Sequence, residues 1–301
     1  MQIPIHSKKL KTMIKGYLKE SGAAMKLVQL IIAFFVILIF TSAIVTVATN
    51  NDMSDIRSLK IMQLIHAIGM FILPPLTLAY LWSETPLHYL RLSTKLKFSD
   101  VLLVVFLMMA AIPFINLITM LNQQLVLPEF LAPVEAWMKA SELQIAEITE
   151  KMLNVHTPIE LLFNILLIAV VPALGEELFF RGTIQKIFTE RRSAVWGIWI
   201  AAFVFSAIHL QFYGFIPRML LGAFFGYLLF WSESLWLPII AHFVNNAVAV
   251  IFYYLKYNGV KVPDVDTIGT GNTLWLGVLS GILVFAGIYA LKKRASVVAK
   301  Q

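Results

Sequence analysis

The residues of this sequence that could do chemistry are ionisable side chains inside long apolar runs. Such a side chain costs about 2.5 kcal/mol or more in hydrocarbon, so it usually faces a protein interior and marks function. His66 has no recognisable partner, and we interpret it as a packed or cavity-lining histidine. Five others lie close together in the second half of the chain, and their clustering predicts one site: Glu176, Glu177, Arg181, His209 and His242.

The run VVPALGEELFFRG combines two carboxylates and a guanidinium on one helix. Glu177 and Arg181 are four residues apart and can form an ion pair, while Glu176 points about 100° away. One carboxylate can therefore stay unpaired in a low-dielectric pocket, which suits a general base. Pro172 and Gly175 are expected to loosen the helix and to admit water or a substrate backbone. The alternative is that both glutamates belong to structural salt bridges.

Two further apolar runs each place polar groups one helical turn apart. FVFSAIHL puts the Phe205 ring where it can fix the imidazole of His209. LPIIAHFVNNAVAV puts His242 and Asn246 on one face, with Asn245 about 100° to the side. His242 and Asn246 offer two donors aimed at one point, as a developing oxyanion requires. The alternatives for each run alone are a core histidine bonded to a carbonyl and hydrogen bonding between helices.

The composition shows what kind of scaffold must position these residues. Of 301 residues, 59% are hydrophobic and 14% charged, and the mean hydropathy is +0.80, whereas soluble domains have about 25% charged residues. An ordinary soluble enzyme and a disordered chain are therefore excluded. The absence of cysteine excludes disulfides, thiolate metal sites and cysteine nucleophiles. The apolar runs do not alternate as β-barrel strands do, so we predict an all-α polytopic membrane protein.

We predict eight transmembrane helices in one membrane-embedded domain, residues 1–301, with a motif-bearing core at about 161–255. A span needs about 20 apolar residues, and the fifth and sixth are short enough to need packing inside the bundle. The loop at 122–160 contains an amphipathic helix, Pro133–Leu153, which lies on the outer membrane surface or caps the bundle. The predicted spans are 27–48, 61–83, 101–121, 161–185, 194–210, 216–231, 236–255 and 273–291.

The positive charges orient these spans. With both termini in the cytoplasm, sixteen of the 24 Lys and Arg residues fall in cytoplasmic segments, including Lys8, Lys9, Lys11 and Lys300. This bias follows the positive-inside rule, so the net charge of +7 is assigned to membrane topology and not to nucleic-acid binding. Arg181 lies inside a span, and seven residues lie in extracytoplasmic segments: Arg57, Lys60, Lys139, Lys151, Arg218, Lys256 and Lys261.

In straight, parallel helices the candidate residues would lie at different depths in the membrane. At about 1.5 Å per residue, Glu176 lies about 15 Å from the inner end of its predicted span, His209 about 22 Å and His242 about 8 Å. Tilted helices, or a cavity open to one face, must bring them together.

The three motifs together resemble a known family. E-E-x-x-x-R, F-x-x-x-H and H-x-x-x-N, in this order on three membrane helices, are similar to the motifs of the CPBP family, also called the Abi family. This family contains the CAAX prenyl endopeptidases and bacterial proteins related to bacteriocin processing and self-immunity. The resemblance covers Glu176 to Asn246 and the helical core around them, while the first three spans match only in hydrophobicity.

The resemblance implies an intramembrane endopeptidase in a bacterial cytoplasmic membrane, with a peptide or membrane-protein substrate and a site open to the cytoplasm. It implies that Glu176 activates water with the help of His209, and that His242 and Asn246 stabilise the oxyanion. Bacterial members need not act on prenylated substrates, so the substrate does not carry over. The residues that would hold the site are Glu177, Arg181 and Phe205.

Alternatives remain for the mechanism and for the function. We favour a metal-free glutamate mechanism, but Glu176, His209 and His242 are also a ligand set that could bind Zn²⁺. A non-catalytic immunity or scaffolding protein of the membrane is the second functional hypothesis. A proton-coupled transporter is the third, but it predicts inverted repeats between the two halves, and none is visible in the sequence.

Overall fold

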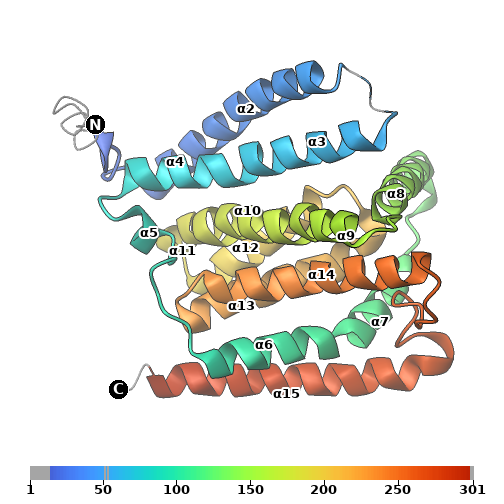
Figure 1. Cartoon of the computed structure of the whole chain (residues 1–301). Helices are drawn as coiled ribbons and strands as arrows, with labels where there is room; N and C mark the ends of the chain where they lie inside the picture. The colour runs from blue at the N-terminus through green and yellow to red at the C-terminus, as the bar shows by residue number, and fades with distance from the viewer. Residues whose placement is uncertain (1–13, 51, 53, 299–301) are drawn as a thin grey trace.

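The computed structural model describes residues 14–50, 52 and 54–298, and within these residues it contains helices and no strand (Figure 1). This confirms the predicted all-α fold of a polytopic membrane protein. Four lysines that contribute to the predicted charge bias lie outside the described residues: Lys8, Lys9, Lys11 and Lys300.

Most of the long helices run nearly parallel or antiparallel to one another across one bundle, while α8 lies at a steep angle to them at one end (Figure 1). Their bounds, in chain order, are α2 (Ala23–Ala48), α3 (Ile56–His66), η1 (Ala67–Ile72), α4 (Leu73–Trp82), α5 (Pro86–Tyr89), α6 (Phe98–Ala110), α7 (Ile112–Gln123), η2 (Glu129–Leu131), α8 (Ala132–Leu153), α9 (Pro158–Asn164), η3 (Ile165–Val170), α10 (Val171–Glu176), η4 (Glu177–Gln185), α11 (Lys186–Arg191), α12 (Ala194–Ala207), η5 (Phe212–Gly214), α13 (Phe215–Ser232), α14 (Trp236–Tyr257), η6 (Gly271–Thr273) and α15 (Leu274–Val298).

The number of spans differs from the predicted eight. Among the described residues, six helical stretches are long and apolar enough to cross a membrane. The pair α6 and α7, which is bent by 45°, makes a seventh if it is one span. The helix α12 coincides with the predicted fifth span but has only 14 residues, fewer than the roughly 20 that a crossing needs. The count of eight is therefore not confirmed, although every predicted span coincides with helix.

The expectation that the fifth span is packed inside the bundle is wrong for one face of α12. Its small residues face the protein, and among them Ala201 and Ala202 are buried. Val195, Trp196 and Phe203 are exposed on the other face. The helix therefore lies at the edge of the bundle, where the apolar residues of its outer face suit contact with lipid.

The start of α2 and the end of α15 lie at the same end of the bundle (Figure 1). Lys26 of α2 forms an ion pair of 2.8 Å with Glu190 of α11, and Arg294 of α15 forms one of 3.0 Å with Asp100 of α6. We call this end the terminal end. The turn between α12 and α13 lies at the opposite end of α12. Which end faces the cytoplasm stays a prediction.

The helix α8 occupies the residues predicted to form an amphipathic helix, and it contacts the bundle instead of lying free. Met138 and Met152 are buried. The backbone carbonyl of Met152 accepts a hydrogen bond of 2.8 Å from Nδ2 of Asn164, and the carboxylate of Glu142 accepts one of 3.4 Å from the backbone N–H of Tyr213. These contacts favour the second predicted arrangement, a cap packed on the bundle.

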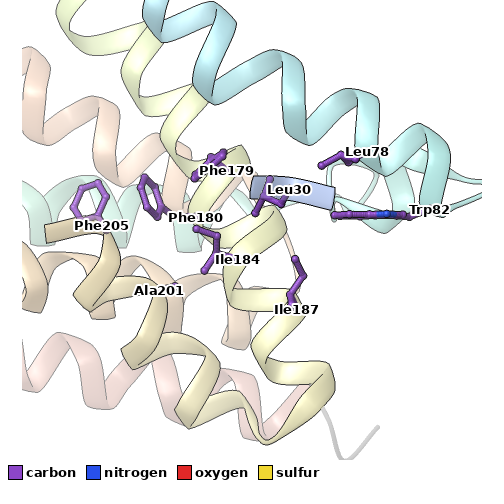
Figure 2. Packing of buried hydrophobic residues seen from close by; sticks show 9 residues of the cluster. All are labelled: Leu30, Leu78, Trp82, Phe179, Phe180, Ile184, Ile187, Ala201 and Phe205. Atoms are coloured by element: carbon purple, nitrogen blue, oxygen red, sulfur yellow. The ribbon is translucent and has the colours of Figure 1, made fainter. Parts of the chain in front are cut away.

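A row of aromatic rings fixes η4 against α12 (Figure 2). The ring of Phe180 packs edge-on against Phe205 at 5.1 Å and against Phe179 at 5.2 Å, measured between ring centroids. Pairs of this kind contribute about 0.5–1.5 kcal/mol each beyond the area that they bury. Leu30 of α2 continues the same core. The helix that carries Glu176 and Glu177 is therefore held on the side facing α2 and α12.

Candidate active site

The three motifs come together in one cavity of about 310 Å³, where the turn between α12 and α13 meets α7, α10 and α14. Glu177 and Arg181 do not line this cavity but lie behind its wall. The motif residues that line it are Glu176, Phe205, His209, His242 and Asn246.

A buried network lies behind the cavity wall. The side chains of Glu177 and Arg181 have 0% of their surface exposed, and Nη1 of Arg181 donates to Oε1 of Glu177 at 2.8 Å. Nδ1 of His242 lies 2.9 Å from the same oxygen. An ionised carboxylate only accepts hydrogen bonds, so Nδ1 of His242 carries the proton. The other nitrogen of the ring, Nε2, is thereby directed toward the cavity.

Two glycines of α13 let this network form. Nη2 of Arg181 donates to the backbone carbonyl of Gly222 at 2.9 Å, and Nε2 of Gln185 donates to that of Gly226 at 3.1 Å. A Cβ atom at Gly226 would lie 2.7 Å from Oε1 of Gln185 and 2.9 Å from Cγ2 of Ile198. Small residues four apart allow helix backbones to approach closely in membranes, and here they expose carbonyls to buried donors.

Glu176 stands apart from the buried ion pair, as predicted. Its Oε2 lies 3.9 Å from Nε2 of His242, too far for a hydrogen bond. Among the residues that the structure describes, no group donates a hydrogen bond to Glu176. The carboxylate is therefore held beside His242 with its oxygens directed at the cavity.

Asn246 is tied to an irregularity in the helix that carries Glu176. Pro172 has no N–H, so it cannot donate to the carbonyl of Ile168, four residues earlier. Nδ2 of Asn246 donates to that carbonyl at 3.2 Å, and Oδ1 of Asn246 accepts from Nδ2 of Asn245 at 3.1 Å. The predicted loosening at Pro172 thus takes the form of π-helix in η3, and it fixes the Asn246 amide at the cavity wall.

His209 lies just beyond the end of α12, in the turn that follows Ala207. Leu210 has a φ of 54° and ends the helix. Nδ1 of His209 lies 2.7 Å from the carbonyl oxygen of Phe205, which can only accept, so Nδ1 is the donor. The Phe205 and His209 rings pack edge-on at 5.1 Å. The predicted contact between these rings is present, and the carbonyl bond adds a second constraint that leaves Nε2 as an acceptor.

Three residues that line or contact the cavity are not predicted by the sequence analysis. Arg218 is counted above among the extracytoplasmic charges, but it lines the cavity. The Phe225 ring stacks on His242 at 5.2 Å, and Asn245 lines the cavity beside Asn246. Arg218 could have been found, because it stands within the apolar run 216–231. Nothing local distinguishes Phe225 from the other phenylalanines of its helix.

The helix lengths resolve part of the predicted mismatch in depth. The fourth helical stretch extends to Arg191, six residues beyond the predicted end. Glu176 is then as far from Arg191 as His209 is from Ala194, at about 22 Å from the terminal end. The longer helix therefore removes the difference in depth that the predicted span ends gave for these two residues.

The alternative zinc site of Glu176, His209 and His242 stays a prediction. Among the described residues, no group of three or more His, Asp or Glu side chains is arranged so that it could hold a metal ion. Each histidine has its Nδ1 engaged, with Glu177 in one case and with the Phe205 carbonyl in the other. Only the two Nε2 atoms remain to face Glu176.

Comparison with known proteins supports the resemblance seen in the motifs. Residues 158–248 match the family model described as "Type II CAAX prenyl endopeptidase Rce1-like". The chain is also 28% identical over 89 residues to the "Uncharacterized protein YpbD" of Bacillus subtilis (strain 168), a match that covers 28% of this chain and 43% of that protein. The chain therefore spans less than half the length of that relative. No solved structure matches. The resemblance to the CPBP family is confirmed for this segment.

Proposed function

We propose that this chain, whose motif-bearing segment matches the Rce1-like family, is an intramembrane endopeptidase that uses Glu176 as its general base. One observation carries the proposal. A carboxylate that accepts no hydrogen bond from the described residues faces the cavity, 3.9 Å from a histidine whose other nitrogen is held by a buried carboxylate. A purely structural ion-pair network needs Glu177 and Arg181 but not Glu176.

The reaction begins when Glu176 takes a proton from a water molecule in the cavity. The hydroxide attacks the carbonyl carbon of the scissile peptide bond, and the carbonyl oxygen becomes an oxyanion. Glu176 then delivers its proton to the amide nitrogen as the C–N bond breaks. The products are a carboxylic acid and an amine. His209 offers Nε2 as an acceptor for the second hydrogen of the water, because its Nδ1 is bonded to Phe205.

The oxyanion requires hydrogen-bond donors. His242 can be one of them only in one protonation state of its ring. Its Nδ1 proton is already donated to Glu177, so Nε2 can donate only when the ring is an imidazolium cation. Oε1 of Glu177 accepts the Nδ1 proton at 2.9 Å and so fixes the orientation of the ring. The second N–H of the Asn246 amide is the other donor, since the first is used on Ile168. Each such donor typically contributes about 10²–10³-fold in rate.

Glu176→Gln tests this function. A general base contributes about 10²–10⁴-fold, so we expect the variant to lose cleavage by at least that factor. The measurement is comparative proteomics of membranes from cells with the wild-type protein and with Glu176→Gln, looking for a precursor that accumulates in the variant. Glu84→Gln is the matched control, because Glu84 is an exposed carboxylate that pairs with Lys19. If Glu176→Gln, expressed at the normal level, leaves the membrane peptides and the cellular phenotype unchanged, the protein acts as a non-catalytic membrane factor.

The metal-free mechanism is part of the proposal and has its own test. Purified protein is analysed for metal and assayed after chelation. Stoichiometric zinc together with loss of activity on its removal would assign Glu176, His209 and His242 to a metal instead. We also propose that the protein resides in a bacterial cytoplasmic membrane, since the relative that it matches is bacterial.

A further inference from the structure

Arg218 is a charge in the cavity that the motifs do not explain. It stands in the first turn of α13 and lines the same cavity as Glu176. A cation in the first turn of a helix faces the positive end of the helix dipole, which is unfavourable. Arg218 is also half-buried, and a charge that is partly removed from water is stabilised by an opposite charge. Its position therefore calls for an anion.

The described part of the chain supplies no such anion at bonding distance. Nη2 of Arg218 donates to Oε1 of Gln211 at 2.6 Å, and Nη1 donates to the backbone carbonyl of the same residue at 3.3 Å. The carboxylates of Glu142 and Glu176 are within electrostatic range of Arg218, but neither forms an ion pair with it. A guanidinium has five N–H donors, so three remain for a ligand.

Two neighbours hold the guanidinium at the cavity wall. Gln211 orients the guanidinium by accepting both of its hydrogen bonds. Gln211 belongs to the connection between α12 and α13 that also carries His209. Gly214 leaves the space that it occupies, because a Cβ atom at that position would lie 3.0 Å from Nη2 of Arg218. The side chain is therefore positioned in advance, before any substrate enters.

We propose that Arg218 binds a carboxylate of the substrate peptide and so determines which peptides the site accepts. This inference rests on the proposed peptidase function. A guanidinium matches a carboxylate with two parallel hydrogen bonds. A peptide offers that group either at its C-terminus or on an Asp or Glu side chain. The first source would place the cleaved bond at a fixed distance from the chain end, and the second would place it at a fixed distance from an acidic residue.

Binding is measured in the Glu176→Gln background, so that no peptide is turned over. The probe is a mixture of synthetic decapeptides in four sets, with a C-terminal acid or a C-terminal amide, and with or without one Glu. Affinity selection followed by mass spectrometry compares Arg218 with Arg218→Gln and Arg218→Lys. We expect Arg218→Gln to weaken binding of the carboxylate-bearing peptides at least tenfold, and Arg218→Lys to weaken it less. Arg57→Gln, which removes an exposed cation at the start of α3, is the matched control.

The four peptide sets identify the source of the carboxylate. A loss confined to the C-terminal acids assigns Arg218 to the chain end, and a loss that follows Glu in the amidated set assigns it to a side chain. The inference is overturned if Arg218→Gln binds every peptide set as tightly as the protein with Arg218 does. So does an equal loss in every set, including the amides without Glu, because that result indicates a structural role.

Cleavage of the same peptides by protein with Glu176 separates this inference from the proposed function. Arg218-dependent binding without cleavage leaves the carboxylate site standing and removes the peptidase. Cleavage that is indifferent to the carboxylate in both wild type and Arg218→Gln keeps the peptidase and removes the carboxylate site. If nothing binds and nothing is cleaved, both are wrong.

Discussion

The buried pair of Glu177 and Arg181 gives the sharpest test of how the site is held together. Arg181→Met keeps most of the length of the side chain and removes its charge. Oε1 of Glu177 then has His242 as its only partner, and Oε2, which already lacks a hydrogen-bond partner, stays unpaired. Removing one member of a buried ion pair costs about 3–5 kcal/mol. We expect that loss in the free energy of unfolding.

The double variant Glu177→Leu, Arg181→Met separates charge from packing. Replacing both partners by apolar residues is often neutral. The remaining costs are the donor lost at the carbonyl of Gly222 and the acceptor lost at Nδ1 of His242, about 1–3 kcal/mol each at most. The double variant should therefore be more stable than Arg181→Met alone. It should nevertheless be inactive, because His242 loses the carboxylate that orients its ring.

Reversible unfolding by SDS in detergent micelles, followed by tryptophan fluorescence, measures these free energies. A loss of about 3 kcal/mol is more than a hundredfold in the unfolding constant. Lys151→Met is the matched control, since Lys151 and Glu147 have the same four-residue spacing at 2.7 Å with side chains 61% and 67% exposed. It should leave the midpoint unchanged. The reasoning is refuted if Arg181→Met is as stable as the wild type, or if the double variant is less stable than Arg181→Met.

Two further predictions concern the contacts around the site. Gly226→Leu should destabilise the fold by about 1–3 kcal/mol through overpacking, because its Cβ would meet Gln185 and Ile198; Gly22→Ser, which keeps a favourable N-cap residue for α2 and adds a Cβ with nothing within 4 Å, should not destabilise it in the same SDS titration. Burial raises the pKa of the Glu142 carboxyl above its usual 4.5, so its contribution to the docking of α8 is full at low pH and is lost as the pH rises through the raised pKa. Hydrogen exchange in α8 should show this dependence, corrected for intrinsic rates, and Glu142→Gln should remove it; an unchanged profile would contradict the role of Glu142.

The parts of the site that could be predicted from sequence depend on spacing within one helix. The ion pair of Glu177 and Arg181 follows from a separation of four residues, and so does the unpaired state of Glu176. The donors of His242 and Asn246 were predicted only as a pair aimed at one point. Their actual partners lie on other helices, at Glu177 and Ile168. Contacts between helices depend on packing, which spacing along one helix does not encode.

The parts that could not be predicted depend on where helices begin and end. Hydropathy does not distinguish a helix that crosses the membrane from α12, which is apolar but stops at Ala207. Hydropathy also ends the fourth span at 185, although the helix continues through the charged residues of α11. Arg218 stands inside the predicted span 216–231 although it is counted with the extracytoplasmic charges, and its place at the cavity depends on the turn at Leu210, which hydropathy does not reveal.

The position of the cavity bears on the orientation of the whole protein. The half of the bundle between the cavity and the terminal end is filled by residues that are almost fully buried, among them Leu178, Leu228 and Leu235. The cavity is therefore closed in that direction, and its lining at Gly214 and Arg218 belongs to the turn at the opposite side. The distribution of positive charge predicts cytoplasmic termini, and the family resemblance implies a site open to the cytoplasm. In a bundle closed on its terminal side, these two expectations exclude each other, unless the substrate enters between helices from the lipid.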